Sequence, residues 1–239
     1  MEALLKNVLF LDIETVSLTK DWKELDPRLQ VAWGKKALQL HPECSSVEEY
    51  YFEKAAIYAE FGRVIVIGIG YFHESTAGEL CFRVKSLANS DEKQLLTDFC
   101  EVIQKSFPSP ELTLCAHNGK EFDFPYLCRR MMVNGLILPH CLQISGKKPW
   151  EVRHFDTLEF WKFGDRKHFT SLELLAAIFE IPTSKETIDG SMVNKTYYLD
   201  GKLELIADYC RRDVVVLGQL FLKMHAIPLP KAENVVMLG

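Results

Sequence analysis

Residues 6–15 read KNVLFLDIET, and they give the clearest indication of a central strand that carries polar residues. Residues 6–12 are almost continuously apolar, which is typical of a strand buried on both faces of a sheet. Asp12 and Glu14 stand where this strand is expected to end. Because side chains alternate along a strand, the two carboxylates share one face while Ile13 points the other way. Such a pair is costly unless a cation lies between the acids. A strand end that frays into solvent, with both acids hydrated, explains it equally well.

The chain around this first strand alternates strands and helices. The strongest further strand is predicted over residues 63–72 (RVIVIGIGYF), with residues 79–85 as its hairpin partner, and shorter strands are predicted over residues 112–116 and 154–156. Helices are predicted over residues 90–105, 124–133 and 203–225, the last being the longest. This order is typical of an α/β fold in which helices flank a mixed central sheet.

Residues 17–60 carry mixed charge and no clear alternation. Ser46 is expected to cap a helix in this block, because Glu48 and Glu49 follow in its first turn. We interpret the block as an insertion between two strands of one sheet. Pro228 and Pro230 end the long helix, so a short tail is expected from about residue 226. The 239 residues are therefore interpreted as a single domain with an insertion at about 17–60.

Composition excludes several classes of protein. The chain is 48% apolar, which is too much for a disordered protein, and its net charge of −5 disfavours a broad nucleic-acid-coating surface. Its longest nearly apolar run covers residues 64–72, far short of the ~20 residues that a membrane span needs. The first residues lack a signal-peptide pattern, and the seven cysteines lack a Cys-x-x-Cys pair. We expect a cytoplasmic protein with reduced thiols and no membrane contact.

We call Asp12 and Glu14 the first motif. Two further groups of polar residues follow it along the chain. The second motif runs from Asn118 to Asp123, at the turn between the strand at 112–116 and the next helix. The third motif is Tyr209 and Asp213, which are four residues apart and so share one face of the long helix. Each has an ordinary structural explanation when taken alone. Asp123 can cap a helix, and Tyr209 with Asp213 can be a boundary tyrosine beside an exposed acid.

Taken together and in order, the motifs are an Asp-x-Glu in the first strand, an Asn-x-x-x-Phe-Asp at a strand–helix turn and a Tyr-x-x-x-Asp in the last long helix. They resemble the three motifs of the DEDD superfamily of 3′-5′ exonucleases, whose fold is ribonuclease H-like. At the position of Tyr209 a related branch of the superfamily has a histidine. The tyrosine resembles the DEDDy branch, which includes polymerase proofreading domains and ribonuclease D-like enzymes.

The resemblance extends to the residues between the motifs. Residues 154–158 (HFDTL), 170–176, 188–193 and 209–214 resemble the exonuclease domain of family-B DNA polymerases, and above all its small, stand-alone bacterial relatives. The similarity covers about residues 6–222 apart from the insertion. No polymerase domain accompanies the motifs, which leaves open a protein partner such as a polymerase or a repair factor, and a role in proofreading or DNA repair.

The resemblance implies a site with two divalent metal ions, Mg²⁺ or Mn²⁺, for which carboxylate oxygens are suitable ligands. Asp12, Glu14 and Asp213 would hold the first ion. Asp12 would bridge to the second ion, with Asp123 supporting it. Tyr209 would orient the attacking water, since an ordinary pKa of ~10 makes a tyrosine a poor base at neutral pH.

The resemblance also implies the reaction. It is hydrolysis of the terminal phosphodiester bond of a single-stranded end, DNA more than RNA, with release of nucleoside 5′-monophosphates. Thr15, through its backbone, with Asn118 and Phe122 would contact the terminal nucleotide. A ribonuclease D-like exoribonuclease is the nearest alternative, because contacts to the 2′ position are not visible in a sequence.

Two alternatives belong to other classes of function. A catalytically idle nucleic-acid-binding module predicts at least one missing carboxylate, and none is missing from the three motifs. A structural adaptor would dock through residues 17–60 or 228–239.

Basic clusters at residues 147–148 and 166–168 are candidate contacts for a phosphate backbone, although solvated loop charge is the simpler explanation. Gly68 and Gly70 lie inside a predicted strand and open no helix, so they are not a dinucleotide-binding fingerprint.

Overall fold

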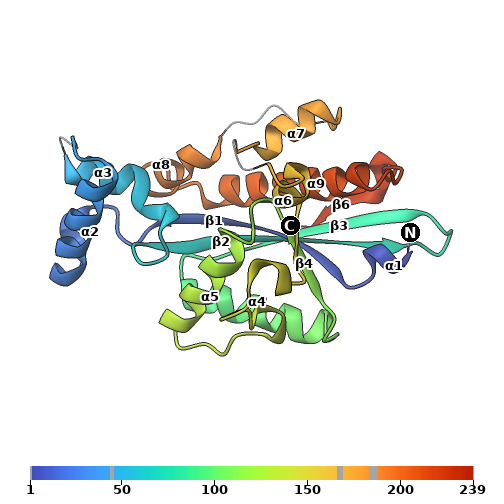
Figure 1. Ribbon diagram of the computed structural model, residues 1–239, viewed down its shortest axis with the longest axis horizontal. Helices are drawn as coiled ribbons and strands as arrows, with labels where there is room; N and C mark the ends of the chain where they lie inside the picture. Colours follow the sequence, from blue (N-terminus) through green and yellow to red (C-terminus); the bar gives the residue numbers. More distant parts are fainter. Residues whose placement is uncertain (1, 44–45, 166–168, 183–187, 239) are drawn as a thin grey trace.

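A computed structural model describes residues 2–43, 46–165, 169–182 and 188–238 (Figure 1). Its centre is a six-stranded sheet with the strand order β5-β4-β1-β2-β3-β6. The strands are β1 (Val8–Ser17), β2 (Gly62–Glu74), β3 (Leu80–Ala88), β4 (Thr113–Ala116), β5 (Phe155–Asp156) and β6 (Val235–Leu238). The first three pair antiparallel, whereas β4, β5 and β6 each join a neighbour in parallel. The predicted mixed central sheet is therefore confirmed.

Helices cover both faces of this sheet (Figure 1). One face carries α4 (Glu92–Ser106) and α5 (Asp123–Val133). The long helix α9 (Leu203–Met224) crosses the other face, on the side of the sheet where α6 (Thr157–Lys162), α7 (Leu172–Ile178) and α8 (Val193–Tyr198) also lie. The other α-helices that the structure describes are α1 (Glu2–Leu5), α2 (Pro27–Leu40) and α3 (Val47–Lys54). Within the described ranges, no helix is long and apolar enough to cross a membrane.

β1 is longer than the sequence predicts. The prediction ended the strand at residue 12, but β1 continues past both acids of the first motif. Asp12 lies opposite Gly68 of β2, and this antiparallel partner supplies the ladder that keeps the backbone extended. The register shifts between Glu14 and Thr15, an irregularity of the kind that often accompanies functional sites. The two acids therefore lie within the sheet and not at a fraying strand end.

Alternation along β1 decides which helices its side chains meet. The side chains that join the core cluster with α4 and α5 are Leu9, Leu11 and Ile13. Phe10 faces the other way and packs edge-to-face on Phe221 of α9, with ring centroids 5.3 Å apart. Asp12 and Glu14 follow Phe10 at intervals of two residues and so continue the face that α9 covers.

Glycines allow α9 to lie close against β2. A Cβ atom on Gly68 would come within 2.8 Å of both Cys210 Sγ and Val214 Cγ2 of α9, and one on Gly70 would come equally close to Val214. A glycine inside a strand often marks such a close approach of another element. Gly68 and Gly70 therefore allow α9, which carries the third motif, to pack directly on the sheet.

A buried ion pair fixes α5. Glu92 of α4 accepts hydrogen bonds from Arg130 of α5, with Oε2 and Nη2 2.6 Å apart, and from the backbone N–H of Val64 at 2.8 Å. Arg130 also donates to the backbone oxygen of Ala59 at 2.9 Å. Arg130 thus ties α5 to α4 and to the segment before β2, and its removal would leave the charge of Glu92 without a cation in the interior.

The residues between β1 and β2 form a small helical unit at one end of the sheet (Figure 1). Its own apolar cluster consists of Leu25, Trp33, Ala37, Tyr51, Ala55 and Phe61. Ser46 caps α3 as predicted, accepting from the backbone N–H of Glu49 at 3.1 Å. Asn194 of α8 ties the unit to the sheet, because its amide accepts from Ser17 N at 2.9 Å and donates to the backbone oxygen of Phe52 at 2.7 Å.

The segment beyond α9 returns to the sheet. The sequence predicts only a tail from about residue 226, whereas residues 235–238 form β6, which pairs in parallel with β3. Lys231 Nζ supports this return through an ion pair with Glu79 Oε1 at 2.6 Å. β6 covers an edge of β3 that would otherwise expose unpaired backbone groups.

Candidate active site

The first two motifs meet where β4 ends beside β1. β4 pairs with β1 only over residues 8–10, so the pairing stops before the acids of the first motif. Asp123, the first residue of α5, enters this gap, and its Oδ1 accepts a hydrogen bond from the backbone N–H of Ile13 at 3.2 Å. Crevices beside the carboxyl ends of parallel strands are common ligand sites in α/β proteins.

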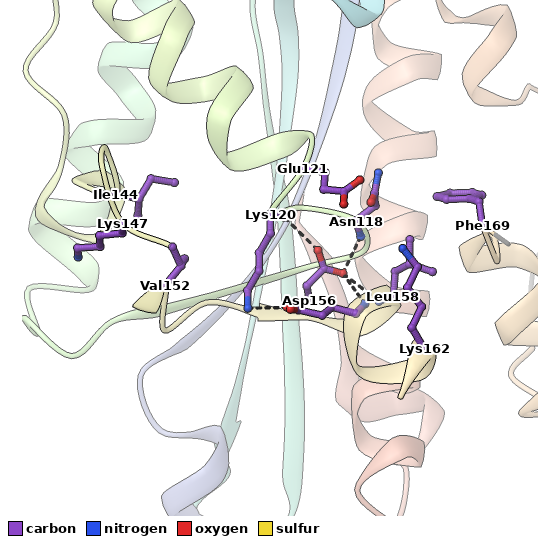
Figure 2. A pocket seen from close by; sticks show the side chains of 11 residues that line it. Asn118, Lys120, Glu121, Ile144, Lys147, Val152, Asp156, Leu158, Lys162 and Phe169 are labelled. Atoms are coloured by element: carbon purple, nitrogen blue, oxygen red, sulfur yellow. Dashed lines mark hydrogen bonds and ion pairs between the residues drawn. The ribbon is translucent and has the colours of Figure 1, made fainter. Parts of the chain in front are cut away.

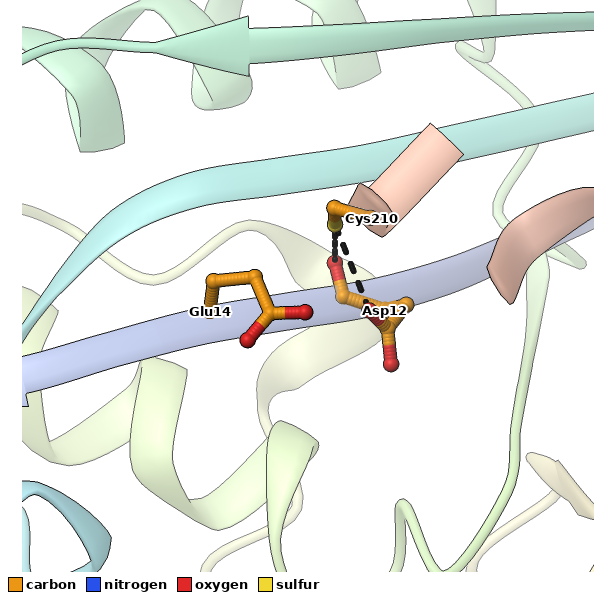
Figure 3. Close-up of side chains that lie close together, drawn as sticks. All are labelled: Asp12, Glu14 and Cys210. Carbon is orange, nitrogen blue, oxygen red and sulfur yellow. Dashed lines mark hydrogen bonds between the residues drawn. The ribbon is translucent and has the colours of Figure 1, made fainter. Parts of the chain in front are cut away.

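The acids of the first motif lie beside Cys210 of α9 (Figure 3). One ligand atom from each of Asp12, Glu14 and Cys210 lies within 4.8 Å of the others. The Cys210 thiol donates to Asp12 Oδ2 at 3.3 Å and approaches the Asp12 backbone oxygen at 3.5 Å. Glu14 and Cys210 are buried, and Asp12 is half-buried. The prediction that the two acids share a face is confirmed, and α9 closes that face.

The pKa of Asp12 reflects several charges that converge on it. Burial raises the pKa of Asp12 well above its ordinary value, and the negative charges of Asp213 and Asp123 raise it further. Burial also raises the pKa of Asp123 to about 7, although the hydrogen bond from Ile13 N–H opposes this shift. The structure therefore brings together acids from β1, α5 and α9 that are far apart in the sequence.

Tyr209 faces the same group of acids. Burial raises the pKa of its phenol far above the ordinary value, and the charges of Asp213, Glu14 and Asp12 raise it further. The phenol also donates a hydrogen bond to Asp213. A phenol among carboxylates keeps its proton at neutral pH, so Tyr209 can donate and orient but cannot serve as a general base.

The second motif forms a tight turn between β4 and α5. Asn118 has a left-handed φ of 62°, which asparagine tolerates better than most residues, and its backbone oxygen accepts from Phe122 N–H at 3.0 Å. Asp156, at the end of β5, holds the turn in place. Its two carboxylate oxygens accept from the backbone N–H groups of Asn118 and Lys120, both at 3.0 Å. The turn thus begins at Asn118 and brings Phe122 directly before Asp123, the first residue of α5.

Thr15 and the two basic clusters are the other candidates that the sequence offered. Thr15 is buried in β1 beside the register shift, so its side chain offers little surface to a nucleotide, and contact through its backbone stays a prediction. Lys147 and Lys148 are exposed. The basic cluster at 166–168 lies outside the described residues.

Sequence reasoning missed two residues that organise this site. Cys210 is one of the seven cysteines expected only to be reduced, and the packing of α9 on β1 brings its thiol to Asp12. Asp156 was quoted only as part of a flanking stretch. It caps α6, accepting from Leu158 N–H at 2.9 Å. An aspartate directly before a helix start signals such a cap, but no local pattern reveals its bonds to the second motif.

The donor set fits a divalent cation. Burial raises the pKa of both Asp12 and Asp123, and the charges of Asp213 and Asp123 add to the shift of Asp12. A bound cation would offset the penalty on these charges. Carboxylate oxygens suit Mg²⁺ and Mn²⁺, and the neighbouring thiol of Cys210 adds a softer atom.

Comparisons with known proteins agree with this geometry. The model of a family described as predicted 3′-5′ exonucleases related to the exonuclease domain of PolB matches residues 57–229. DNA polymerase 1 of Pyrococcus abyssi is 27% identical over 187 residues, which cover 70% of this chain and 24% of the polymerase. The DNA polymerase of Pyrococcus glycovorans is 28% identical over 187 residues, covering 70% and 23%. The chain spans about a quarter of the length of these curated relatives.

A solved structure shows the same fold. The family B DNA polymerase from the hyperthermophilic archaeon Pyrobaculum calidifontis superposes with a TM-score of 0.55 at 15% identity, covering 90% of this chain and 24% of that chain. The shared fold is ribonuclease H-like, as the motifs implied.

Proposed function

This chain belongs to the family of predicted 3′-5′ exonucleases related to the exonuclease domain of PolB, and from that premise we propose that it hydrolyses the terminal phosphodiester bond at the 3′ end of single-stranded DNA. One observation carries the proposal: Asp12, Asp123 and Asp213 come from three different elements and lie close enough to raise the pKa of Asp12. Such a cluster is costly without a cation and is the ligand type of two-metal phosphodiester hydrolases.

The carboxylates would hold two divalent ions, Mg²⁺ or Mn²⁺. Asp12, Glu14 and Asp213 would bind the first, and Asp12 with Asp123 the second. When bound, such ions lower the pKa of water and stabilise charge on the attacking and leaving oxygens. The hydrogen bonds from Cys210 to Asp12 and from the Ile13 N–H to Asp123 would hold these proposed ligands in place before the ions bind.

Tyr209 and the second motif would position the reactants. The protonated phenol of Tyr209 orients the attacking water and takes no proton from it, because its pKa is raised far above neutrality. Asn118 would hydrogen-bond the terminal nucleotide, and Phe122 would pack against it. Cleavage between phosphorus and the 3′ oxygen of the penultimate nucleotide leaves the phosphate on the released one, a nucleoside 5′-monophosphate. Removal of incorrect 3′ ends in DNA repair or proofreading is the role that this activity suits.

The direct test is degradation of a 5′-end-labelled oligonucleotide in Mg²⁺ and in Mn²⁺. Wild type, Asp12→Ala and Asp200→Ala are compared, the last removing an exposed carboxylate from the α8–α9 connection. We expect a 3′-to-5′ ladder from wild type and Asp200→Ala, and none from Asp12→Ala or with a chelator present. The absence of a ladder from wild type in either metal would overturn the proposal.

The same assay with an RNA oligonucleotide of matched sequence tests whether the enzyme prefers deoxyribose or ribose. Faster degradation of RNA would replace DNA by RNA as the substrate, since only a contact at the 2′ position distinguishes the two.

A further inference from the structure

A cavity lies beside the turn of the second motif (Figure 2). Its volume is about 730 Å³, within the ~300–1,000 Å³ of typical ligand pockets. Its walls come from the turn at Asn118, from the connection of residues 144–152 and from α6. The acids of the first and third motifs do not line it, so the hydrolytic step does not account for it.

Three of the charged side chains in this cavity already have partners within the protein. The Lys120 ammonium pairs with Glu159 Oε2 at 2.6 Å, and the Lys120 side chain is only 18% exposed. Asp156 accepts from four backbone N–H groups, two in the turn and two at the start of α6. Both carboxylates therefore hold the walls of the cavity together, and the charge of Glu159 is balanced by that of Lys120.

Two further lysines face this cavity. Lys147 and Lys162 line the cavity, and neither makes an ion pair with any residue in the described ranges. Glu121 is the remaining acid at its edge. These two lysines can each contact a phosphate group, and each lysine that does so releases a counterion from a nucleic acid.

The rim of the cavity carries an exposed aromatic ring. Phe169 is 64% exposed, and its ring lies edge-on to His117 with centroids 6.1 Å apart. His117 is itself fixed by Thr157 Oγ1 and by the backbone oxygen of Thr170, both at 2.9 Å. The apolar wall is made by Ile144, Val152 and Leu158. A positioned, exposed aromatic beside lysines is the combination on which single-stranded nucleic acids stack.

We propose that this cavity binds a nucleotide of the substrate strand that lies 5′ of the scissile bond, with its base against Phe169 and a phosphate near Lys147 and Lys162. The proposal rests on the proposed function, because it takes the 3′ end to lie at the carboxylates. Asn118 lines the cavity and begins the turn that ends at Asp123. Five residues of chain span at most about 18 Å. A strand with its 3′ end at Asp123 therefore reaches the cavity within a few nucleotides.

The first experiment measures binding without turnover. A fluorescent ten-nucleotide single-stranded DNA is titrated into Asp12→Asn protein, alone and combined with Lys147→Ala, Lys162→Ala or the control Lys35→Ala, at several salt concentrations. Lys35 lies on α2, at the far end of the sheet (Figure 1). We expect each cavity lysine to weaken binding and to reduce the slope of log K against log salt by about 0.7, while the control leaves it unchanged. Equal slopes for all four proteins would overturn the proposal.

The second experiment uses the active protein and the length of the substrate. Phe169→Ala should lower kcat/KM for a ten-nucleotide DNA at least about five-fold more than for a dinucleotide, because only the longer strand reaches the ring. Equal losses on both substrates would refute the placement of the upstream nucleotide. If wild type cleaves neither substrate, the proposed function fails, and the binding experiment still decides whether the cavity takes single-stranded DNA.

Discussion

Asp123→Asn should make the metal-free protein more stable at neutral pH while abolishing cleavage. The Asp123 carboxyl is 4% exposed, and burial raises its pKa to about 7, against an ordinary 3.8. As the pH rises, the unfolded chain loses this proton first, so the folded protein binds more protons between about pH 4 and 7. The stability of the wild type therefore falls through that range, and the loss is complete above pH 7. Asparagine does not titrate, so the variant escapes this loss.

The size of the effect follows from the two pKa values. They differ by about three units of about 1.4 kcal/mol each, which gives a destabilisation of up to about 4 kcal/mol above pH 7. Asparagine keeps an oxygen that can accept from Ile13 N–H, now 3.2 Å from Asp123 Oδ1. An amide oxygen accepts less strongly than a carboxylate, at a cost of about 1 kcal/mol. The net gain of about 3 kcal/mol corresponds to a rise in Tm of about 6–12 °C for a chain of this size.

The assay is thermal and urea unfolding with a chelator at pH 5 and pH 8. Asp98→Asn on α4 is the matched control, because its side-chain oxygen can still accept from Gln94 Nε2, which now lies 2.7 Å away. We expect the advantage of Asp123→Asn to grow from pH 5 to pH 8, and to shrink when Mg²⁺ or Mn²⁺ is added, since the cation stabilises the wild type more. A variant less stable than wild type at pH 8, or with the same advantage at both pH values, would show that burial of a charged Asp123 does not destabilise the wild type.

Three other substitutions test the supports of the site. Cys210→Ala should lower kcat about five-fold, because Asp12 loses a hydrogen bond worth about 1 kcal/mol. Cys210→Ser should keep the donor and most of the rate, and equal losses of kcat for the two variants in steady-state assays would contradict this. Gly68→Ala should cost about 1–3 kcal/mol in urea unfolding and also lower kcat, since its Cβ would press on α9, and a fully stable, fully active variant would speak against that contact. Arg130→Ala should lower the free energy of unfolding by about 3–5 kcal/mol, because the charge of Glu92 loses its cation in the interior, while kcat per folded molecule is retained. Unfolding unchanged from wild type would show that the pair adds no stability.

Sequence periodicity was sufficient for features that depend on a single element. The strand period placed Asp12 and Glu14 on one face, and the helix period marked out residues 203–225, close to the observed α9 (Leu203–Met224). Such patterns are local and survive in almost any tertiary context. The extension of β1 beyond Asp12 was missed because it depends on pairing with β2.

Features that depend on how distant elements pack were not predictable. The contact between Cys210 and Asp12 joins residues 198 positions apart and follows from the close approach of α9 at Gly68. β6 has only four residues, VVML, too few for a periodic signal, and its partner β3 lies far upstream. The cavity beside Asn118 likewise arises from three separate segments.

The order in which the acids occur along the chain has a consequence for protein synthesis. Asp12 and Asp123 emerge early, but Asp213 lies in α9, near the end of the 239 residues. At roughly 5–20 residues per second, a ribosome makes Asp213 about 10–40 s after Asp12. Throughout that interval the nascent polypeptide lacks one wall of its acidic centre. An acidic centre divided in this way lacks the carboxylate of Asp213 until α9 has been synthesised, so it cannot present its full set of acids while the earlier elements are being made.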